Sequence, residues 1–354
     1  MGTSVDASGQ LLEQVLEALA TRSPMRIQGS DSKAHLGRPV IGQALDTRVH
    51  RGIVSYDPTE LVVTVRAGTP LAELEQALDE QGQWLPCEAP HLGHDATVGG
   101  MVAAGLSGPR RPWAGSVRDF VLGTRLITGH GKHLRFGGEV MKNVAGYDVS
   151  RLMAGSFGCL GVITEVSLKV LPKPRAVANL RLVTDGTAAL RMLGEWGQQP
   201  LPLSAACHDG EALHLRLEGG EGSVASARDR LGCETVEAGF WEALREQRLP
   251  FFADPRPLWR LSLPTAIPAL ALHGAQLMDW GGAQRWLKSE APAEEIRRIV
   301  SQVGGHATCY SAGSECDDSP FHPLPALLKR YHLQLKAQMD PLGIFNPGRL
   351  YADL

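Results

Sequence analysis

The apolar positions of the first 175 residues alternate between helical and strand spacings. Between residues 8 and 21 they recur on one helical face, which predicts a helix. Residues 25–28 predict a short strand that enters a turn, and residues 52–56 and 60–66 predict two paired strands. Thr69 suits the capping position of a second helix, with Pro70 as its first residue and Gly82 near its end.

The hydrophobic pattern changes near residue 175. Before that point, residues 125–128 and 133–136 flank a glycine-containing turn and predict a hairpin, and residues 162–170 alternate as a half-buried strand does. Pro172 and Pro174 follow this strand, so we place a domain boundary near residue 175. Beyond it, strands and helices predict an α+β domain over residues 176–338, with a last helix from about 323 to 339.

Composition and charge exclude several classes of function. The chain has 354 residues, 43% of them hydrophobic and 21% charged, and a formal net charge of −3. This balance is typical of a globular protein and argues against nucleic-acid binding, which needs concentrated Lys and Arg. The N-terminus lacks the pattern of a signal peptide, and no apolar run is long enough to cross a bilayer. The six cysteines form no CxxC pair, which argues against a zinc or iron–sulfur site and suits reduced thiols in the cytosol.

The glycines gather in segments, and the first comprises Gly29, Ser30, Asp31, Ser32 and Lys33. A turn of small residues can point successive N–H groups into one concavity that binds an anion. Gly29 lets a backbone or ligand approach closely, the two serines can donate hydrogen bonds, and Lys33 supplies positive charge. A plain surface turn has the same composition, and this segment alone favours the plain turn.

Two further segments have the same character. Residues 95–108 predict a helix that begins near Gly99 and offers free N–H groups to a phosphate, although tight helix packing explains the small residues equally well. Gly155, Gly158 and Gly161 precede the strand at residues 162–170, and the backbone at the start of this strand could bind a purine edge. By itself this third segment is more typical of a glycine-rich loop that enters a strand.

Several nucleotide-binding and catalytic signatures are missing from the sequence. No GxGxxG joins a strand to a helix and no GxxxxGK[ST] occurs, so neither a Rossmann site nor a P-loop is supported. HExxH and GxSxG are missing too, which leaves zinc-protease and α/β-hydrolase functions without support.

From Thr97 to Pro172 the sequence resembles the FAD-binding domain of the vanillyl-alcohol oxidase/D-lactate dehydrogenase flavoprotein superfamily. Segments 97–101, 115–123, 143–148 and 155–165 carry the resemblance, and residues 340–349 are similar to the superfamily's C-terminal signature. The resemblance implies an α+β fold: a PCMH-type FAD-binding domain of two α+β subdomains over residues 1–175, then an α+β cap domain over residues 176–338. Residues 339–354 would return toward the FAD domain.

The resemblance also implies how FAD would be bound. Residues 29–33 would grip the diphosphate, residues 97–101 would line the ribityl and flavin side, and the backbone at residues 162–163 would contact the adenine edge. The residues expected to bind the cofactor are Gly29, Ser30, Asp31, Ser32, Lys33, Thr97, Gly99, Gly100, Met101, Gly105, Ser107, Gly161, Val162 and Ile163.

Nearly the whole chain resembles the FAD-binding subunits of bacterial glycolate oxidase, most specifically at residues 28–34, 107–113 and 279–283. This implies a cytoplasmic oxidoreductase that acts on the CH–OH group of 2-hydroxy acids together with a catalytic flavin subunit and an iron–sulfur subunit. Any membrane association would come through those subunits. The alternatives are a self-sufficient dehydrogenase of another 2-hydroxy acid, such as D-lactate, and a scaffold subunit without flavin.

The cap departs from related 2-hydroxy-acid dehydrogenases, which carry a metal-binding HxGDGNxH motif. This chain lacks that string, and the solitary His306 is more typical of a structural histidine. No metal is therefore expected, and no catalytic acid–base residue can be assigned. Arg110, Arg111 and Trp113 suit either a face toward a bound acid or a partner surface, and the sequence leaves the two open.

Overall fold

The computed structural model describes residues 4–139, 147–265, 267–311 and 319–354, and the chain divides into two compact units. Unit 1 combines Met1–Ser107, Gly115–Pro172 and Pro323–Leu354, and unit 2 combines Gly108–Ala114 and Lys173–His322. The division after residue 172 lies close to the boundary that the sequence predicts near residue 175.

The predicted cap, residues 176–338, differs from unit 2 at two places. The last helix, α11 (Ala326–Met339), belongs to unit 1, where the Lys336 ammonium donates to the carbonyl of Cys159 at 2.7 Å. The short segment Gly108–Ala114 belongs to unit 2, where the indole N–H of Trp280 donates to the Gly108 carbonyl at 3.0 Å. Both differences arise from contacts between residues more than 170 positions apart, which local patterns do not contain.

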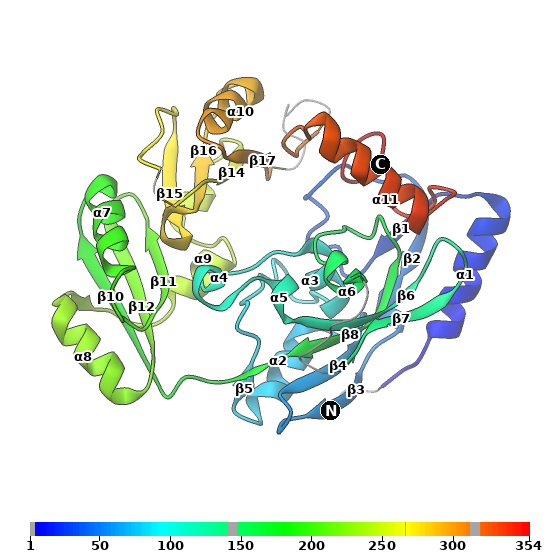
Figure 1. The fold of residues 1–354 in the computed structure, drawn as a ribbon, viewed down its shortest axis with the longest axis horizontal. Coiled ribbons are helices and arrows are strands. Elements are labelled where there is room, and N and C mark those ends of the chain that lie inside the picture. Colours follow the sequence, from blue (N-terminus) through cyan, green and yellow to red (C-terminus); the bar gives the residue numbers. More distant parts are fainter. Residues whose placement is uncertain (1–3, 140–146, 266, 312–318) are drawn as a thin grey trace. The chain divides into compact units, whose positions relative to one another are not determined.

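Unit 1 is built on a five-stranded antiparallel sheet in the order β3-β4-β8-β6-β7 (Figure 1). The hairpin predicted at residues 125–136 is formed by β6 and β7, and the pair predicted at residues 52–66 by β3 and β4. The strands of this sheet are β3 (Ile53–Asp57), β4 (Val62–Arg66), β6 (Val121–Ile127), β7 (His133–Gly137) and β8 (Val162–Lys169). A separate two-stranded pair is formed by β5 (Gln83–Trp84) and β9 (Leu171–Pro172).

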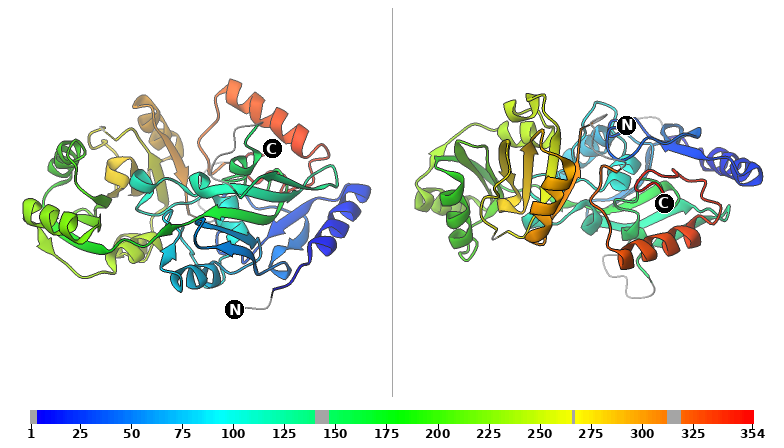
Figure 2. Two further views of the ribbon diagram at one scale, coloured as in Figure 1. Left: turned by 60° about the horizontal axis from the view of Figure 1, so that its bottom comes forward. Right: turned by 90° about the horizontal axis from the view of Figure 1, so that it is seen from above.

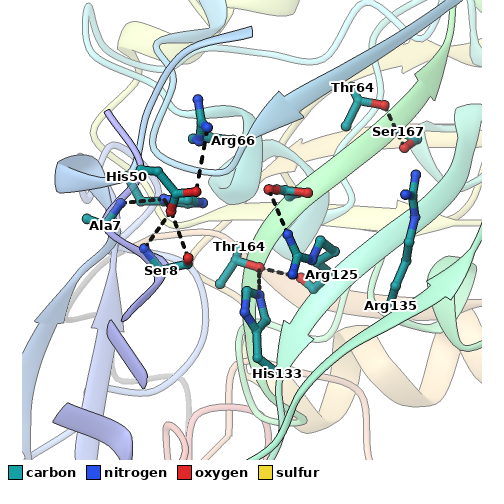
Figure 3. Close-up of polar contacts among 12 residues, drawn as sticks. Ala7, Ser8, His50, Thr64, Arg66, Arg125, His133, Arg135, Thr164 and Ser167 are labelled. Atoms are coloured by element: carbon teal, nitrogen blue, oxygen red, sulfur yellow. Dashed lines mark hydrogen bonds and ion pairs between the residues drawn. The ribbon is translucent and has the colours of Figure 1, made fainter. Parts of the chain in front are cut away.

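The strand β8 is buried on both faces, which corrects the prediction of a half-buried strand. It lies in the centre of the sheet, and its polar side chains find partners on the neighbouring strands. Thr164 Oγ1 lies 2.8 Å from His133 Nε2, Ser167 Oγ lies 2.8 Å from Thr64 Oγ1, and Arg125 donates to the Glu165 carboxylate at 3.3 Å (Figure 3). Because these groups are hydrogen-bonded, the polar residues of the alternating pattern can be buried.

A second layer of unit 1 joins the two ends of the chain. The parallel strands β1 (Met25–Gln28) and β2 (Gln43–Asp46) pair with each other, and Met25 also forms a parallel bridge with Phe345. Figure 2 shows the C-terminal segment in red beside the N-terminal segment in blue. An apolar core joins α1 (Ser8–Thr21) to these strands through Leu11, Val15, Met25, Leu45 and Phe345. The predicted helix at residues 8–21 and strand at residues 25–28 are confirmed.

The remaining helices of unit 1 are short. Thr69 does not cap α2 as predicted: Pro70 holds that position, and the Thr69 hydroxyl donates to the Arg66 carbonyl at 2.7 Å and accepts from the Gly52 N–H at 2.8 Å. The predicted motif at residues 143–146 lies outside the described residues. These elements are α2 (Leu71–Asp79), α3 (Val98–Ala104), α5 (Val117–Phe120), α6 (Val149–Leu152) and the 3₁₀ turn η1 (Thr47–Val49).

Unit 2 is an eight-stranded antiparallel sheet in the order β13-β10-β12-β11-β15-β16-β14-β17. One apolar cluster packs α7 and α8 on β10–β12, and another packs α10 on β14, β16 and β17. The antiparallel strands β11 and β12 form a hairpin whose turn contains Asp209. The strands are β10 (Ala176–Val183), β11 (Leu203–His208), β12 (Ala212–Gly219), β13 (Glu234–Thr235), β14 (Leu258–Ser262), β15 (Ala275–Asp279), β16 (Gln284–Lys288) and β17 (His306–Cys309). The helical elements are α4 (Arg111–Ala114), α7 (Gly186–Trp196), α8 (Glu221–Leu231), α9 (Phe240–Arg245), α10 (Ala293–Gln302), η2 (Pro250–Ala253) and η3 (Trp280–Gly282).

Among the described cysteines, Cys87, Cys159, Cys207 and Cys233 are free thiols, as the sequence suggests. Cys309 is disulfide-bonded, so the prediction of reduced thiols is wrong for this residue.

Candidate cofactor-binding site

A cavity of about 290 Å³ opens in unit 1 where β1 ends. Its wall is formed by the turn at residues 29–34, the start of α3, Phe157, and Asn346 and Arg349 from the C-terminal segment. A smaller cavity of about 80 Å³ shares Gly29, Gly100, Phe157 and Asn346 with it, so the two are adjacent, and the smaller one extends to Gly161 and Ile163. The larger cavity is close to the lower size limit of small-molecule and cofactor sites.

The turn after β1 packs tightly against the start of α3. A Cβ placed on Gly29 would lie 2.5 Å from Thr97 Oγ1, so a larger residue would push the turn away from the helix. Asp31, in the same turn, has a left-handed backbone with φ 56° and lines the cavity. Glycine at position 29 is therefore required by the close approach.

The start of α3 differs from the prediction of free N–H groups. The Val98 and Gly99 N–H groups donate to the carbonyls of Thr69 and Ala67, at 2.9 and 2.8 Å. The Gly100 N–H donates to the capping hydroxyl of Thr97 at 3.2 Å. The first three amides of this helix are thus already bonded within the protein, because the helix starts against the loop after β4. The α3 residues that line the two cavities are all glycine or alanine. At Gly99 a larger residue would not fit, because a Cβ there would lie 2.7 Å from the Ala67 Cβ.

The third glycine-rich segment is tied to α3 by backbone hydrogen bonds. The Gly155 N–H donates to the Val102 carbonyl at 3.0 Å and the Phe157 N–H to the Ala103 carbonyl at 2.9 Å. Gly158 has a left-handed backbone, with φ 72°, and a Cβ there would lie 2.6 Å from Asn346 Nδ2. This segment therefore forms one side of the smaller cavity at a fixed distance from the helix.

The C-terminal segment contributes two residues that were not among the predicted site residues. Asn346 accepts from the Ile27 N–H at 2.8 Å and donates to the Phe157 carbonyl at 2.7 Å, so one side chain joins β1 to the third glycine-rich segment. Arg349 donates to the carbonyls of Arg38 at 2.8 Å and Ala34 at 3.2 Å. The similarity of residues 340–349 to a family signature was visible in the sequence, but it did not assign these contacts.

Ten of the predicted cofactor residues line the two cavities: Gly29, Ser30, Asp31, Ser32, Lys33, Thr97, Gly99, Gly100, Gly161 and Ile163. Within the described chain, the other four lie outside both linings. Val162 and Met101 are core residues, Gly105 ends α3 with φ 65°, and the Ser107 hydroxyl accepts from the Val117 N–H at 3.0 Å. The structure thus brings together residues from all three glycine-rich segments.

The charges around the larger cavity suit an anionic group. Arg26, Lys33 and Arg349 line it together with a single carboxylate, Asp31, which is 3.1 Å from Arg26. The Lys33 ammonium donates to the carbonyl of His91 at 2.9 Å, which holds it beside the turn. An excess of cations over a wall of small residues and backbone fits a dinucleotide diphosphate.

Burial lowers the pKa of two basic groups beside the cavity, His35 and Arg349. It lowers the pKa of His35, helped by the nearby positive charges of Lys33 and Arg349, so this imidazole is neutral at pH 7. Burial also lowers the pKa of the Arg349 guanidinium. In both cases burial is the main cause, because it disfavours the charged form of the side chain.

No group of three or more metal-binding side chains exists among the residues that the structure describes. Likewise, none of the helices in the described part of the chain is long and apolar enough to span a membrane.

Comparisons with known proteins first define a class. Residues 5–137 match the family model of the FAD binding domain. A solved alkyldihydroxyacetonephosphate synthase has the same fold, with a TM-score of 0.67 and 17% identity, and covers 97% of this chain and 76% of its own. The chain therefore contains an FAD binding domain, and the expected α+β fold class is confirmed.

The full-length comparison identifies the family. The chain is 63% identical over 349 residues to the glycolate oxidase subunit GlcE of Escherichia coli (strain K12), with 99% of both chains covered. It is 39% identical over 129 residues to a D-lactate dehydrogenase of Anaerostipes hadrus and 34% over 128 residues to the glycolate oxidase subunit GlcD of Bacillus subtilis (strain 168). Each of these two alignments covers 36% of this chain, with 26% and 27% of the relatives. The chain belongs to the GlcE family.

Proposed function

We propose that this chain is the FAD-binding subunit of a glycolate oxidase (glycolate dehydrogenase) and takes part in the oxidation of glycolate to glyoxylate. One observation carries the proposal: the identity to GlcE extends over both chains almost completely, so it includes unit 2 as well as the FAD binding domain. The alignments to D-lactate dehydrogenases cover about a third to a half of this chain and support the alternative substrate only distantly.

The chain's own residues would hold the cofactor and exclude water around it. The turn at residues 29–33 would bind the diphosphate through its backbone and hydroxyls, and Thr97, Gly99 and Gly100 would support it from α3. The backbone near Gly161 and Ile163 would contact the adenine edge in the smaller cavity. When bound, FAD would supply the acceptor for the hydride equivalent that leaves the CH–OH group of a 2-hydroxy acid.

We further propose that the chain acts in the cytoplasm as part of a complex. Its partners would be a catalytic flavin subunit, which carries the fuller substrate site, and an iron–sulfur subunit, which takes electrons onward. The name of the relative, a subunit of glycolate oxidase, supports an assembly. Any contact with the membrane would then be made by the partners.

Flavin counting on the assembled complex tests this function. The full chain is expressed alone and together with the two partner subunits, and flavin released by denaturation is measured per chain. We expect a complex that releases one FAD from this chain in addition to the flavin of the catalytic subunit, and glycolate-dependent dye reduction only in the complex. A chain that is colourless alone, in a complex that releases only the flavin of the catalytic subunit, would favour the scaffold function. Rapid glycolate oxidation by the chain alone would favour a self-sufficient dehydrogenase.

A further inference from the structure

Arg349 is the last residue in the sequence to line the larger cavity, and its guanidinium lies beside the turn that follows β1. It donates to the carbonyls of Arg38, Ala34 and Lys33, at 2.8, 3.2 and 3.5 Å. Its own backbone carbonyl accepts from the Arg38 N–H at 2.9 Å. Arg349 and the segment after Ser32 are therefore held in one fixed arrangement.

The charge of Arg349 lacks the partner that the neighbouring arginine has. Within the described residues, no carboxylate lies within 4.0 Å of the Arg349 guanidinium, and its hydrogen bonds go to neutral carbonyls. Arg26, at the same cavity, forms an ion pair with Asp31, and 42% of its side chain is exposed. Burial lowers the pKa of Arg349 and the charge of Asp31 acts to raise it, but the Asp31 carboxylate is already paired with Arg26. Because burying a charge is costly and the hydrogen bonds of Arg349 go to neutral carbonyls, an anion in the cavity would stabilise its guanidinium.

We propose that Arg349 provides the main positive charge that binds the FAD diphosphate, so that the C-terminal segment completes the cofactor site. This inference rests on the proposed binding of FAD. The planar guanidinium suits bidentate hydrogen bonding to phosphate oxygens. Its contacts with backbone carbonyls fix its position in the wall of the cavity. Burial lowers the pKa of Arg349, and a bound diphosphate would reverse that effect.

The fixed position of Arg349 follows from the residues that precede it. Asn346 has a left-handed backbone, with φ 40°, and its side chain bonds both β1 and the third glycine-rich segment. The Arg349 N–H donates to the Asn346 carbonyl at 3.2 Å, which continues this anchored turn. Asn346 is thus a positioning residue, whereas Arg349 would contact the cofactor itself.

The test compares ligands that differ in phosphate content. Full-length R349Q, R135Q and wild-type chains are stripped of flavin, and the affinities for FAD, ADP and riboflavin are measured by titration. For R349Q we expect FAD and ADP to bind about 10- to 100-fold more weakly, as for the loss of a charged hydrogen-bonding group, and riboflavin to change less than about twofold. The control R135Q should change all three affinities less than about threefold, because Arg135 lies outside both cavity linings and forms an exposed ion pair with Glu139.

The outcomes separate this inference from the proposed function. If the wild-type chain binds no FAD, the proposed function fails first. If it binds FAD but R349Q binds FAD equally well, or loses riboflavin as strongly as FAD, Arg349 does not bind the diphosphate. A measurement on the wild-type chain covers the case in which R349Q does not fold: ADP should protect Arg349 from modification by phenylglyoxal, mapped by mass spectrometry, and equal modification with and without ADP would overturn the inference.

Discussion

The Lys336–Asp340 pair in the C-terminal segment gives a sharp prediction about the stability of unit 1. The Lys336 ammonium donates three hydrogen bonds, to the Cys159 carbonyl at 2.7 Å, the Asp340 carboxylate at 2.7 Å and the Phe345 carbonyl at 2.8 Å. The Asp340 carboxylate is almost fully buried and also accepts from the N–H groups of Ile344 and Phe345, at 3.2 and 2.8 Å. The substitution K336M keeps most of the side-chain volume and removes the charge.

The magnitude follows from what K336M leaves behind. A buried carboxylate loses its ion-pair partner and two buried carbonyls lose their donor, and removing one member of a buried pair costs about 3–5 kcal/mol. For a unit of this size, 1 kcal/mol shifts the melting temperature by about 2–4 °C, so the transition of unit 1 should move down by roughly 6–20 °C. The assay is thermal unfolding of the flavin-free chain, followed by far-ultraviolet circular dichroism.

The same helix offers a matched control. Lys329 and Asp353 are 2.6 Å apart, and about half of each side chain is exposed, so K329M should cost less than about 1 kcal/mol. The double variant K336M/D340N removes both charges and should recover part of the loss. If K336M proves as mild as K329M, the buried pair does not hold the C-terminal segment and the reasoning is refuted.

Three further predictions concern pH, the glycine turn and the thiols. Burial lowers the pKa of His50, so protonation favours the unfolded state, and the free energy of unfolding should fall as the pH drops below about 6.5. In chemical denaturation, H50N should reduce the slope of this free energy against pH by up to about 1.4 kcal/mol per pH unit, and an unchanged slope would contradict the prediction. G29A should weaken FAD binding at least about tenfold in a titration, since its Cβ would lie 2.5 Å from Thr97 Oγ1, whereas G9A, in open space on α1, should bind FAD normally and melt slightly higher. Among the free thiols, Cys233 should react first with Ellman's reagent, because the other three are buried and burial raises the pKa of Cys87 to about 12; faster labelling of Cys87 would show that this core opens.

The elements that the sequence predicted correctly are those with strong local periodicity. The helix at residues 8–21 and the strand at residues 25–28 have the predicted bounds, because their apolar spacing alone decides which face is buried. The errors come from contacts outside the local window. The strand β8 alternates polar and apolar residues but lies between two other strands, and the amides of α3 that were predicted to be free bond to the loop after β4.

In the candidate site, too, local sequence patterns indicate some residues, and only contacts between distant residues indicate the others. The three glycine-rich segments were recognisable because small residues at turns carry information about backbone geometry. Asn346 and Arg349 were not, because the hydrogen bond from Ile27 to Asn346 joins residues 319 positions apart. Arginine and asparagine near a C-terminus have many uses, and only the pairing of the segment with β1 determines which one applies here.

This long-range pairing also limits when the cofactor site can form. The strand β1 has β2 on one side, and on the other it needs the hydrogen bonds from Met25 to Ile344 at 2.7 Å and from Asn346 to Met25 at 3.0 Å. A nascent chain that has completed unit 2 still lacks these residues, since the last part of unit 1 begins only at Pro323. Because non-local contacts form late and slowly, the cavity beside the turn at residues 29–33 acquires its full wall only after the whole chain is made. The cofactor would then bind to a finished chain, and its binding energy would stabilise the C-terminal segment and the first turn together.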